Sequence, residues 1–344
     1  MSSGTRLRVL VLRALGLGDL LTAVPALRAL RRHLPGHEIV LAAPERLAEP
    51  AAATGLVDRL LPASGPGRAV PADLAWDGPP PDLAVDLHGN GPQSHQLLRR
   101  LRPGRLFAYA HPQMSDLSGP AWQPDEHERE RWCRLLRWYG IKADPADLRI
   151  PPPTTPSPAP GAIVVHPGAD AAARRWPKER FAAVARELHR GGHEVVVTAG
   201  GGEGALARFV ATEAELPPAA VLGGARDVPF DQLAALVARA RCVVVGDTGL
   251  AHLATALGTP SVVLFGPVAP RLWGPPADPR HRVLWHPGTD DSPRPGDAHG
   301  RHPDERLLRI TVDEVVEAVR ELPEPDTDPS YERTTTAQGL PPLP

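Results

Sequence analysis

The 344-residue sequence has very few lysines and cysteines and no long apolar run. Its 38 basic residues are arginines except for Lys142 and Lys178. The formal net charge of −2 leaves no overall positive field, which argues against nucleic acid as a partner. Cys133 and Cys242 lie in apolar segments without metal-ligand spacing. We therefore predict reduced core thiols, no disulfide and no metal site.

No stretch approaches the roughly 18 apolar residues that a membrane-spanning helix needs. The first residues, MSSGTRLRVLVLRALG, are interrupted by arginines and a glycine turn, which is not typical of a signal peptide. We therefore expect a cytoplasmic monomer, either free or associated with the cytoplasmic face of the membrane. Residues 1–150 carry 19 basic and 16 acidic residues, a small excess that would suit an anionic acceptor or a membrane surface.

Short apolar runs alternate with amphipathic segments, and 42% of the residues are hydrophobic, as in globular proteins. The patterns predict strands at 7–15, 38–43, 82–90, 105–110, 162–168, 193–201, 241–247 and 261–267. They predict helices at 19–33, 126–139, 181–192 and 313–322, and two more after the strands that end near 90 and 247. This alternation predicts an α/β fold with parallel sheets covered by helices on both faces.

The proline-rich segment PPPTTPSPAP, residues 151–160, divides two similar halves of the chain. We predict a Rossmann-like domain over 1–150, a stiff linker over 151–160, a second Rossmann-like domain over 161–322 and a disordered tail over 323–344. Ligands of such folds bind at the carboxyl ends of the strands, so the two doubly wound sheets should face a shared cleft.

The segment VVVGDTGLAHLATALGTPSVVLFGP, residues 243–267, predicts a strand, a tight turn and a helix. Asp247, Thr248 and Gly249 form the turn, and His252 falls in the first helical turn. A helix N-terminus with a hydroxyl and free N–H groups is a phosphate site. In the alternative interpretation, Asp247 or Thr248 is only an N-cap and His252 is a surface residue.

Two further loops follow predicted strands of the second half. In HPGADAAARRWPKERF, residues 166–181, Arg174 and Arg175 could stabilise a diphosphate leaving group. Alternatively this is a solvated basic loop anchored by Trp176. In TAGGGEGALA, residues 198–207, Gly201 belongs to a glycine-rich turn, and Glu203 is suited to binding ribose hydroxyls.

In the first half, GLGDLL at residues 16–21 places Asp19 directly after Gly18, between a strand and a helix. Taken alone, this carboxylate is most simply a helix cap. The turn VDLHGNGPQS carries His88, Asn90 and Gln93, which are either acceptor-binding residues or a structural turn.

In order and spacing, these segments resemble glycosyltransferase family nine, the heptosyltransferases, which have the two-domain GT-B fold. The resemblance runs from about residue 7 to 322 and rests on RALGLGDLLTAVPALRAL, VDLHGNGPQS, HERERW, LLRWYGI, VVHPGA, RRWPKERF, VVVTAGGGE, VGDTGLAHLATALGTPSVVLFGP and the WGP at residues 273–275. It implies inverting transfer of a sugar, often from ADP-heptose, to a glycan or glycolipid acceptor. The donor would bind mainly to the C-terminal domain and the acceptor to the N-terminal domain, with no cofactor.

The resemblance also implies individual roles. Asp19 would be the general base, and Glu203 lies near the ribose-binding carboxylate of the family. The donor diphosphate and sugar would be bound by Asp247, Thr248, Gly249, Leu250 and His252. Arg174 takes the place of a lysine that usually pairs with the diphosphate, so binding should survive with altered geometry. The sequence patterns described above, rather than the resemblance, suggest further site residues: Arg175 on the donor side, Gly201 for the nucleoside, and Gly18, His88, Asn90 and Gln93 on the acceptor side.

Arginines and a helix N-terminus would carry the phosphate charge, so no metal ion is needed for this chemistry. Two alternatives remain: an epimerase or hydrolase of the same fold, and a non-catalytic nucleotide-sugar-binding protein. A nicotinamide dehydrogenase is disfavoured, because GLGD lacks the third glycine of the dinucleotide motif. The small basic excess of the first half leaves lipopolysaccharide in question as the acceptor.

Overall fold

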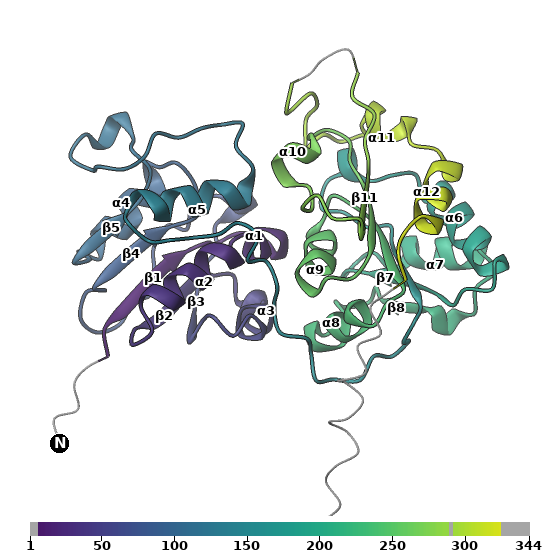
Figure 1. The fold of residues 1–344 in the computed structure, drawn as a ribbon, viewed down its shortest axis with the longest axis horizontal. Helices are drawn as coiled ribbons and strands as arrows, with labels where there is room; N and C mark the ends of the chain where they lie inside the picture. The colour runs from purple at the N-terminus through teal and green to yellow at the C-terminus, as the bar shows by residue number, and fades with distance from the viewer. Residues whose placement is uncertain (1–5, 289–291, 325–344) are drawn as a thin grey trace, which may run out of the picture.

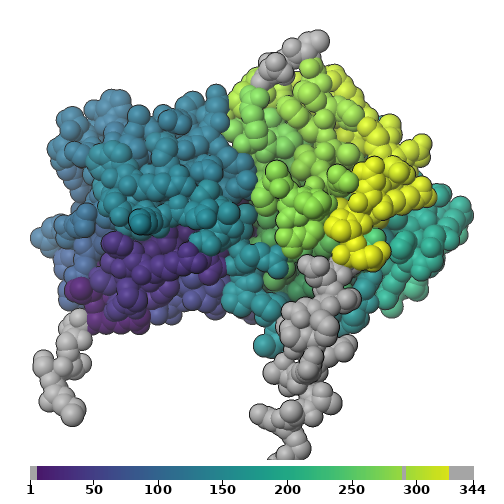
Figure 2. Space-filling model, viewed as in Figure 1, coloured from purple at the N-terminus to yellow at the C-terminus, as the bar shows by residue number. Residues whose placement is uncertain are grey.

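The computed structural model describes residues 6–288 and 292–324, so most of the predicted disordered tail lies outside the described residues. Two α/β domains lie side by side (Figure 1), and they form two lobes in the space-filling view (Figure 2). None of the helices in the described ranges has both the length and the hydrophobicity that crossing a bilayer requires.

The N-terminal domain is built on a five-stranded, all-parallel sheet in the order β3-β2-β1-β4-β5. Its strands are β1 Arg8–Leu12, β2 Glu38–Ala43, β3 Arg59–Pro62, β4 Leu83–Asp86 and β5 Arg105–Phe107. Its helices are α1 Leu17–Thr22, α2 Val24–His33, α3 Ala48–Ala53, α4 Gln93–Arg100 and α5 Glu128–Trp138, with single 3-10 turns η1 Glu45–Leu47, η2 Pro66–Arg68 and η3 Pro112–Met114.

The C-terminal domain has a six-stranded parallel sheet in the order β11-β10-β9-β6-β7-β8. Its strands are β6 Ile163–His166, β7 Val195–Ala199, β8 Val221–Gly223, β9 Cys242–Gly246, β10 Ser261–Leu264 and β11 His281–Leu284. Its helices are α6 Lys178–Arg190, α7 Gly204–Glu213, α8 Phe230–Ala238, α9 Gly249–Leu257, α10 Pro270–Trp273, α11 Glu305–Arg309 and α12 Val312–Arg320, with 3-10 turns η4 Ala172–Arg174 and η5 Pro218–Ala220.

The predicted α/β fold with two doubly wound parallel sheets is confirmed. The helix predicted over 19–33 is wrong in one respect, because it divides at Ala23 into α1 and α2. Pro25 is the cause: it has no N–H to donate, and it sits at the second position of α2, where none is needed. Cys133 and Cys242 are free and buried, as predicted, and burial raises the pKa of each thiol to about 12.

The strand order places the functional loops at the point where each sheet changes direction. In the first sheet this point lies between β1 and β4, and in the second between β6 and β9. The loops leaving these strands diverge to opposite faces of the sheet and leave a crevice at its carboxyl edge. Helices α1 and α3 of the first domain face α8 and α9 of the second (Figure 1), so the two crevices lie opposite each other.

The domains touch most closely where α1 meets α9, and glycines permit the approach. A Cβ on Gly18 would lie 2.7 Å from Cδ2 of His252. A Cβ on Gly249 would lie 3.1 Å from Cβ of Leu17 and 3.3 Å from the main-chain nitrogen of Gly18. Any larger residue at these positions would push the helix ends apart. Glycine therefore serves here for close approach of two backbones.

His127 adds a polar contact between the domains. Its Nε2 lies 3.0 Å from the carbonyl oxygen of Gly274, and its Nδ1 accepts from the N–H of Arg129 at the start of α5. The neutral ring with its proton on Nε2 satisfies both contacts. Burial, and then the nearby charge of Arg129, lower the pKa of His127 to about 4.

We expect this histidine to make the free energy of unfolding depend on pH. The unfolded chain, with an ordinary histidine pKa of about 6.5, binds a proton that the folded state rejects down to about pH 4. The contribution of His127 to the free energy of unfolding is therefore complete above about pH 6.5, and it is lost as the pH falls from there to about 4. In His127→Gln, the slope of unfolding free energy against pH, measured by urea titration, should drop by about 1.4 kcal/mol per pH unit near pH 5. Equal slopes in both proteins would contradict the assignment, and above pH 7 their free-energy difference should be constant.

Candidate active site

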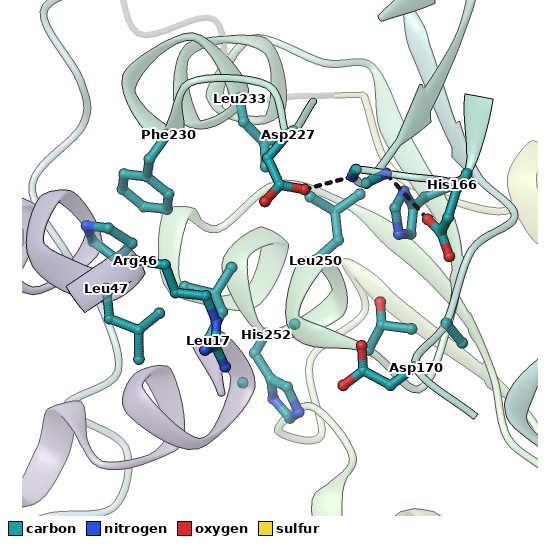
Figure 3. Close-up of a pocket in the computed structure, with 18 of the residues that line it drawn as sticks. Leu17, Arg46, Leu47, His166, Asp170, Asp227, Phe230, Leu233, Leu250 and His252 are labelled. Atoms are coloured by element: carbon teal, nitrogen blue, oxygen red, sulfur yellow. Dashed lines mark hydrogen bonds between the residues drawn. The ribbon is translucent and has the colours of Figure 1, made fainter. Parts of the chain in front are cut away.

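A cavity of about 1230 Å³ lies between the two domains and is lined by residues of both. It is larger than the roughly 300–1,000 Å³ of an ordinary small-molecule site, which leaves room for two substrates. In Figure 3, Leu17, Arg46 and Leu47 of the N-terminal domain project toward Leu250 and His252 of the C-terminal domain.

Asp19 lines this cavity from the first turn of α1 and is 9% exposed. Its Oδ2 accepts from the N–H of Gly16 at 3.0 Å, so the capping interpretation holds for this carboxylate. Cations approach it from two sides. Nη2 of Arg13 lies 3.6 Å from Oδ1, and Nη2 of Arg68 lies 3.7 Å from Oδ2. The carboxylate is thus held by the fold while it faces the cavity.

Arg68 connects the base side of the cavity to the opposite domain. The same Nη2 that approaches Asp19 lies 3.3 Å from Oδ2 of Asp170, which belongs to the loop after β6. Arg68 is partly exposed and Asp170 largely so, which makes this a weak surface ion pair. Neither residue was singled out from the sequence: Arg68 lies in no segment with a recognisable pattern, and in the loop of residues 166–181 the arginines were chosen rather than Asp170.

The start of α9 forms the anion-binding side of the cavity. Thr248 is the N-cap residue, yet its hydroxyl makes no capping bond, and Oγ1 is buried without a hydrogen-bond partner. Nε of Arg174 is likewise buried and unpaired, and its Nη1 lies 3.6 Å from Oδ2 of Asp247. Buried donors without partners are costly unless a ligand satisfies them. A diphosphate oxygen is an acceptor of the required kind.

His252 lies at the junction between the anion site and Asp19. Burial lowers its pKa, an effect that the negative charges of Asp247 and Asp19 partly oppose, so the ring is neutral near pH 7. The ring packs edge-on against Trp273, with 5.9 Å between ring centroids. A neutral imidazole here can donate or accept a hydrogen bond without adding charge. The interpretation of His252 as a plain surface residue is therefore wrong.

Glu203 is fixed by the glycines around it. Its Oε2 accepts from the N–H of Gly200 at 3.0 Å, and its Oε1 lies 3.8 Å from Nη2 of Arg175. A Cβ on Gly168 would occupy the space of this carboxylate, so the HPG sequence at the end of β6 is what makes room for it. The carboxylate lines the cavity, as a ribose-binding group must. Gly201 also lines it, and its N–H donates to Oδ1 of Asp227 at 2.6 Å.

Several lining residues lie outside the segments that the sequence singled out. Asp227 comes from the loop before α8, Phe230 is the first residue of α8, and Arg46 comes from η1 of the other domain. His166, inside a segment that did stand out, also lines the cavity, with Nδ1 3.2 Å from the carbonyl oxygen of Thr198. The sequence RDVPF, in which charged and aromatic residues lie close to a proline, is a feature that could have indicated that the loop before α8 belongs to the site.

The predicted acceptor-side residues are not all brought together. Gly18 lines the cavity, and His88 is close enough to Asp19 for their charges to interact. The expectation that Asn90 faces the same cleft is wrong, because it lines a separate pocket beside η3 with His111. Gln93 is exposed at the start of α4 and does not line the cleft either. The chain turns sharply after β4, so residues two positions apart point into different spaces.

Part of this chain is similar to a known protein family. Residues 146–295 match the model of glycosyltransferase family 9, described as heptosyltransferase. The match to this family covers less than half of the chain. This match covers the anion site, the Glu203 loop and both arginines of η4 and its flank. Asp19 lies outside the matched range, and its position rests on the geometry above.

Two curated proteins that are similar to this chain come from Escherichia coli. Lipopolysaccharide heptosyltransferase 3 is 35% identical over 115 residues, which is 33% of each chain. Lipopolysaccharide heptosyltransferase 2 of strain K12 is 31% identical over 173 residues, or 45% of each chain. The matches thus span less than half the length of these relatives.

The likeness to solved structures extends over nearly the whole chain. The structure of E. coli ADP-heptose lipopolysaccharide heptosyltransferase II is similar, with a TM-score of 0.70 at 21% identity. The alignment covers 91% of this chain and 98% of that one. At this identity the likeness establishes the two-domain GT-B fold.

In the described residues, no group of three or more His, Cys, Asp or Glu side chains is arranged to hold a metal ion.

Proposed function

We propose that this protein transfers a sugar from a nucleotide-diphospho-sugar to a hydroxyl of a glycan or glycolipid acceptor, with inversion at the anomeric carbon. The observation that carries the proposal is the pairing of two groups across one cavity. A carboxylate from the N-terminal domain, Asp19, lines the same cavity as an anion site in the C-terminal domain, where the Thr248 hydroxyl and Nε of Arg174 are buried without hydrogen-bond partners. A general base opposite a leaving-group site is what a single displacement requires.

In the proposed step, the acceptor hydroxyl gives its proton to the Asp19 carboxylate as its oxygen attacks the anomeric carbon. The bond between that carbon and the diphosphate oxygen breaks, and its electron pair leaves with the diphosphate. Arg174 and the N–H groups at the start of α9 then carry the developing negative charge. Attack from the face opposite the leaving group inverts the configuration.

The donor we propose is ADP-heptose or a related nucleotide sugar. The two E. coli relatives and the aligned structure are all heptosyltransferases by name, which supports heptose as the sugar. Glu203, backed by Gly200, is suited to the ribose hydroxyls. The acceptor would occupy the side of the cavity lined by Gly18 and Arg68, and lipopolysaccharide is the first candidate, as in those relatives' names.

We further propose that transfer needs no divalent metal ion, because guanidinium groups and the start of α9 supply the positive charge. Arg174 pairs with Asp247 in the free protein, and Arg175 with Glu203, so both would turn toward the diphosphate on binding. Turnover in EDTA should equal turnover in added Mg²⁺. Loss of activity in EDTA that Mg²⁺ restores would contradict this part of the proposal.

The deciding experiment combines a donor screen with a product assay. Thermal shift with ADP-, GDP-, UDP- and dTDP-sugars identifies the nucleotide, and the stabilising donor is then incubated with lipopolysaccharide core acceptors. We expect glycosylated acceptor with inverted anomeric configuration by NMR. Free sugar released without acceptor would instead indicate a hydrolase. An isomerised donor would indicate an epimerase, and tight binding without turnover would indicate a non-catalytic protein.

A further inference from the structure

A buried arginine lies directly behind Asp19. Arg13 follows β1 and is 1% exposed. Its Nε donates to the main-chain carbonyl of Asp19 at 2.9 Å, and its Nη2 lies 3.6 Å from the Oδ1 atom of the same residue. It also donates to the carbonyl of Leu87 at the end of β4. One guanidinium thus holds both the backbone and the side chain of the proposed base.

A second carboxylate fixes this guanidinium from the other side. Oε1 of Glu128, on α5, lies 2.8 Å from Nη2 of Arg13 and accepts from Nε1 of Trp132 at 3.0 Å. The Trp132 ring lies under the guanidinium, 4.8 Å from its carbon to the ring centroid. Arg131 also approaches Glu128, at 3.4 Å. A buried cation with this many fixed contacts has one accessible position.

We propose that Arg13, held by Glu128, is the positioning residue of the reaction: it fixes the Asp19 carboxylate and places a buried positive charge beside it. The inference rests on the proposed transferase function and deepens it. The planar fork of arginine explains the hold, because it binds two main-chain carbonyls and two carboxylates at once. Burial makes the charge effective, because water screens it little.

Other charged or titratable groups near the Asp19 carboxylate come from three more elements. Arg68 of η2 approaches from the cavity, His88 follows β4, and His252 belongs to α9. Burial lowers the pKa of both histidines, so they add no positive charge near neutral pH. Arg13 differs from Arg68 because it is buried and has a carboxylate partner, Glu128, outside the cavity.

Substitutions that remove the charge of Arg13 or of Glu128 should shift the pH dependence of kcat/KM in opposite directions. In Arg13→Gln, the acid limb of kcat/KM against pH should move up by about one pH unit, because the carboxylate loses a nearby cation. In Glu128→Gln, the limb should move down, because the charge of Arg13 is then shared with one carboxylate fewer. Arg13→Lys keeps the charge and loses the fork, so the limb should stay and kcat should fall about 10-fold.

Stability and donor binding separate this role from a structural one. Arg31→Gln is the matched control: Arg31 also joins a carboxylate, that of Asp58, to main-chain carbonyls of the same domain, but outside the cavity. It should lower the melting temperature and leave the acid limb in place. Donor affinity by calorimetry should be unchanged in all four variants. If Arg13→Gln does not fold, Glu128→Gln and Arg13→Lys decide.

The inference would be overturned if the acid limb of kcat/KM stays at the same pH in Arg13→Gln and Glu128→Gln, or if it moves in the same direction in both. That outcome would leave the proposed function standing, since it presupposes measurable transfer by the unmodified protein. Absence of transfer by the unmodified protein with every donor and acceptor would overturn the proposed function instead. Opposite limb shifts with unchanged donor affinity support both.

Discussion

Asp19→Asn should lower kcat by about 10³-fold while the donor binds as before. The substitution keeps the shape of the side chain and removes its ability to accept the acceptor proton, and general bases typically contribute about 10²–10⁴-fold. Donor affinity should persist because the anion site belongs to the other domain, at Thr248 and Arg174. Transfer rates from steady-state kinetics, with donor Kd from calorimetry, test both halves of this expectation.

Asp147→Asn is a suitable control for that experiment. Asp147 is a carboxylate of the same domain that pairs with Arg32 at 2.5 Å, away from the cavity. We expect its kcat to stay within about twofold of the original value, as for other surface ion pairs. Turnover of Asp19→Asn equal to that of this control would exclude Asp19 as the base, and a search would then begin with His252.

Arg174→Ala should lower kcat/KM by about 10²–10³-fold, through both weaker donor binding and slower departure of the diphosphate. Removing one fixed donor from developing negative charge in a buried site has an effect of this size. Arg174→Lys, which keeps the charge as a point rather than a fork, should recover most of the loss. Steady-state kinetics on the three proteins give both comparisons directly.

A matched arginine on the same domain serves as the control. Arg186 on α6 donates to the carbonyl of Glu213 at 2.8 Å and does not line the cavity. Arg186→Ala should behave like the original protein in kcat/KM. If Arg174→Ala does so as well, the positive charge for the diphosphate must come from Arg175 or from the start of α9 alone.

The strand-loop-helix units of the fold and the anion site were predictable because their causes are local. Thr248 follows a buried strand and precedes a helix, and neighbouring residues determine that geometry. Asp19 is similar: a strand, two glycines and a helix fix its place at the sheet edge. The opposing placement of these two residues followed from a rule about parallel sheets, which places both at carboxyl edges.

Other features depended on contacts between distant segments and could not be predicted. Arg68 reaches Asp19 from a 3-10 turn 49 positions later in the chain, and its own backbone has a positive φ of 67°. Nothing in the local pattern of that turn indicates its target. The prediction for Asn90 failed for a different reason. Its segment does follow β4, but tertiary packing sets the direction of the turn there, and therefore the space that Asn90 faces.

The helices α7 and α8 were also missed, although their sequences are regular. GALARFVATE and FDQLAALVA are rich in alanine and apolar residues on several faces, so the contrast between a buried and an exposed face is weak. Helix α7 packs against α6, and α8 packs against α9. Their amphipathic pattern is blurred because each has protein on more than one side.

The cations that line the cavity are Arg46, Arg68, Arg174 and Arg175, whereas Lys142 and Lys178 lie outside its lining. A guanidinium keeps its proton to about pH 12 and beyond, whereas an ammonium group begins to lose it near pH 10. Alkaline buffers should therefore leave the counter-charge of a bound diphosphate intact. Amine-reactive labels should likewise attach at Lys142 and Lys178 without blocking the cavity, so fluorophores for following donor binding can be placed there through ordinary lysine chemistry.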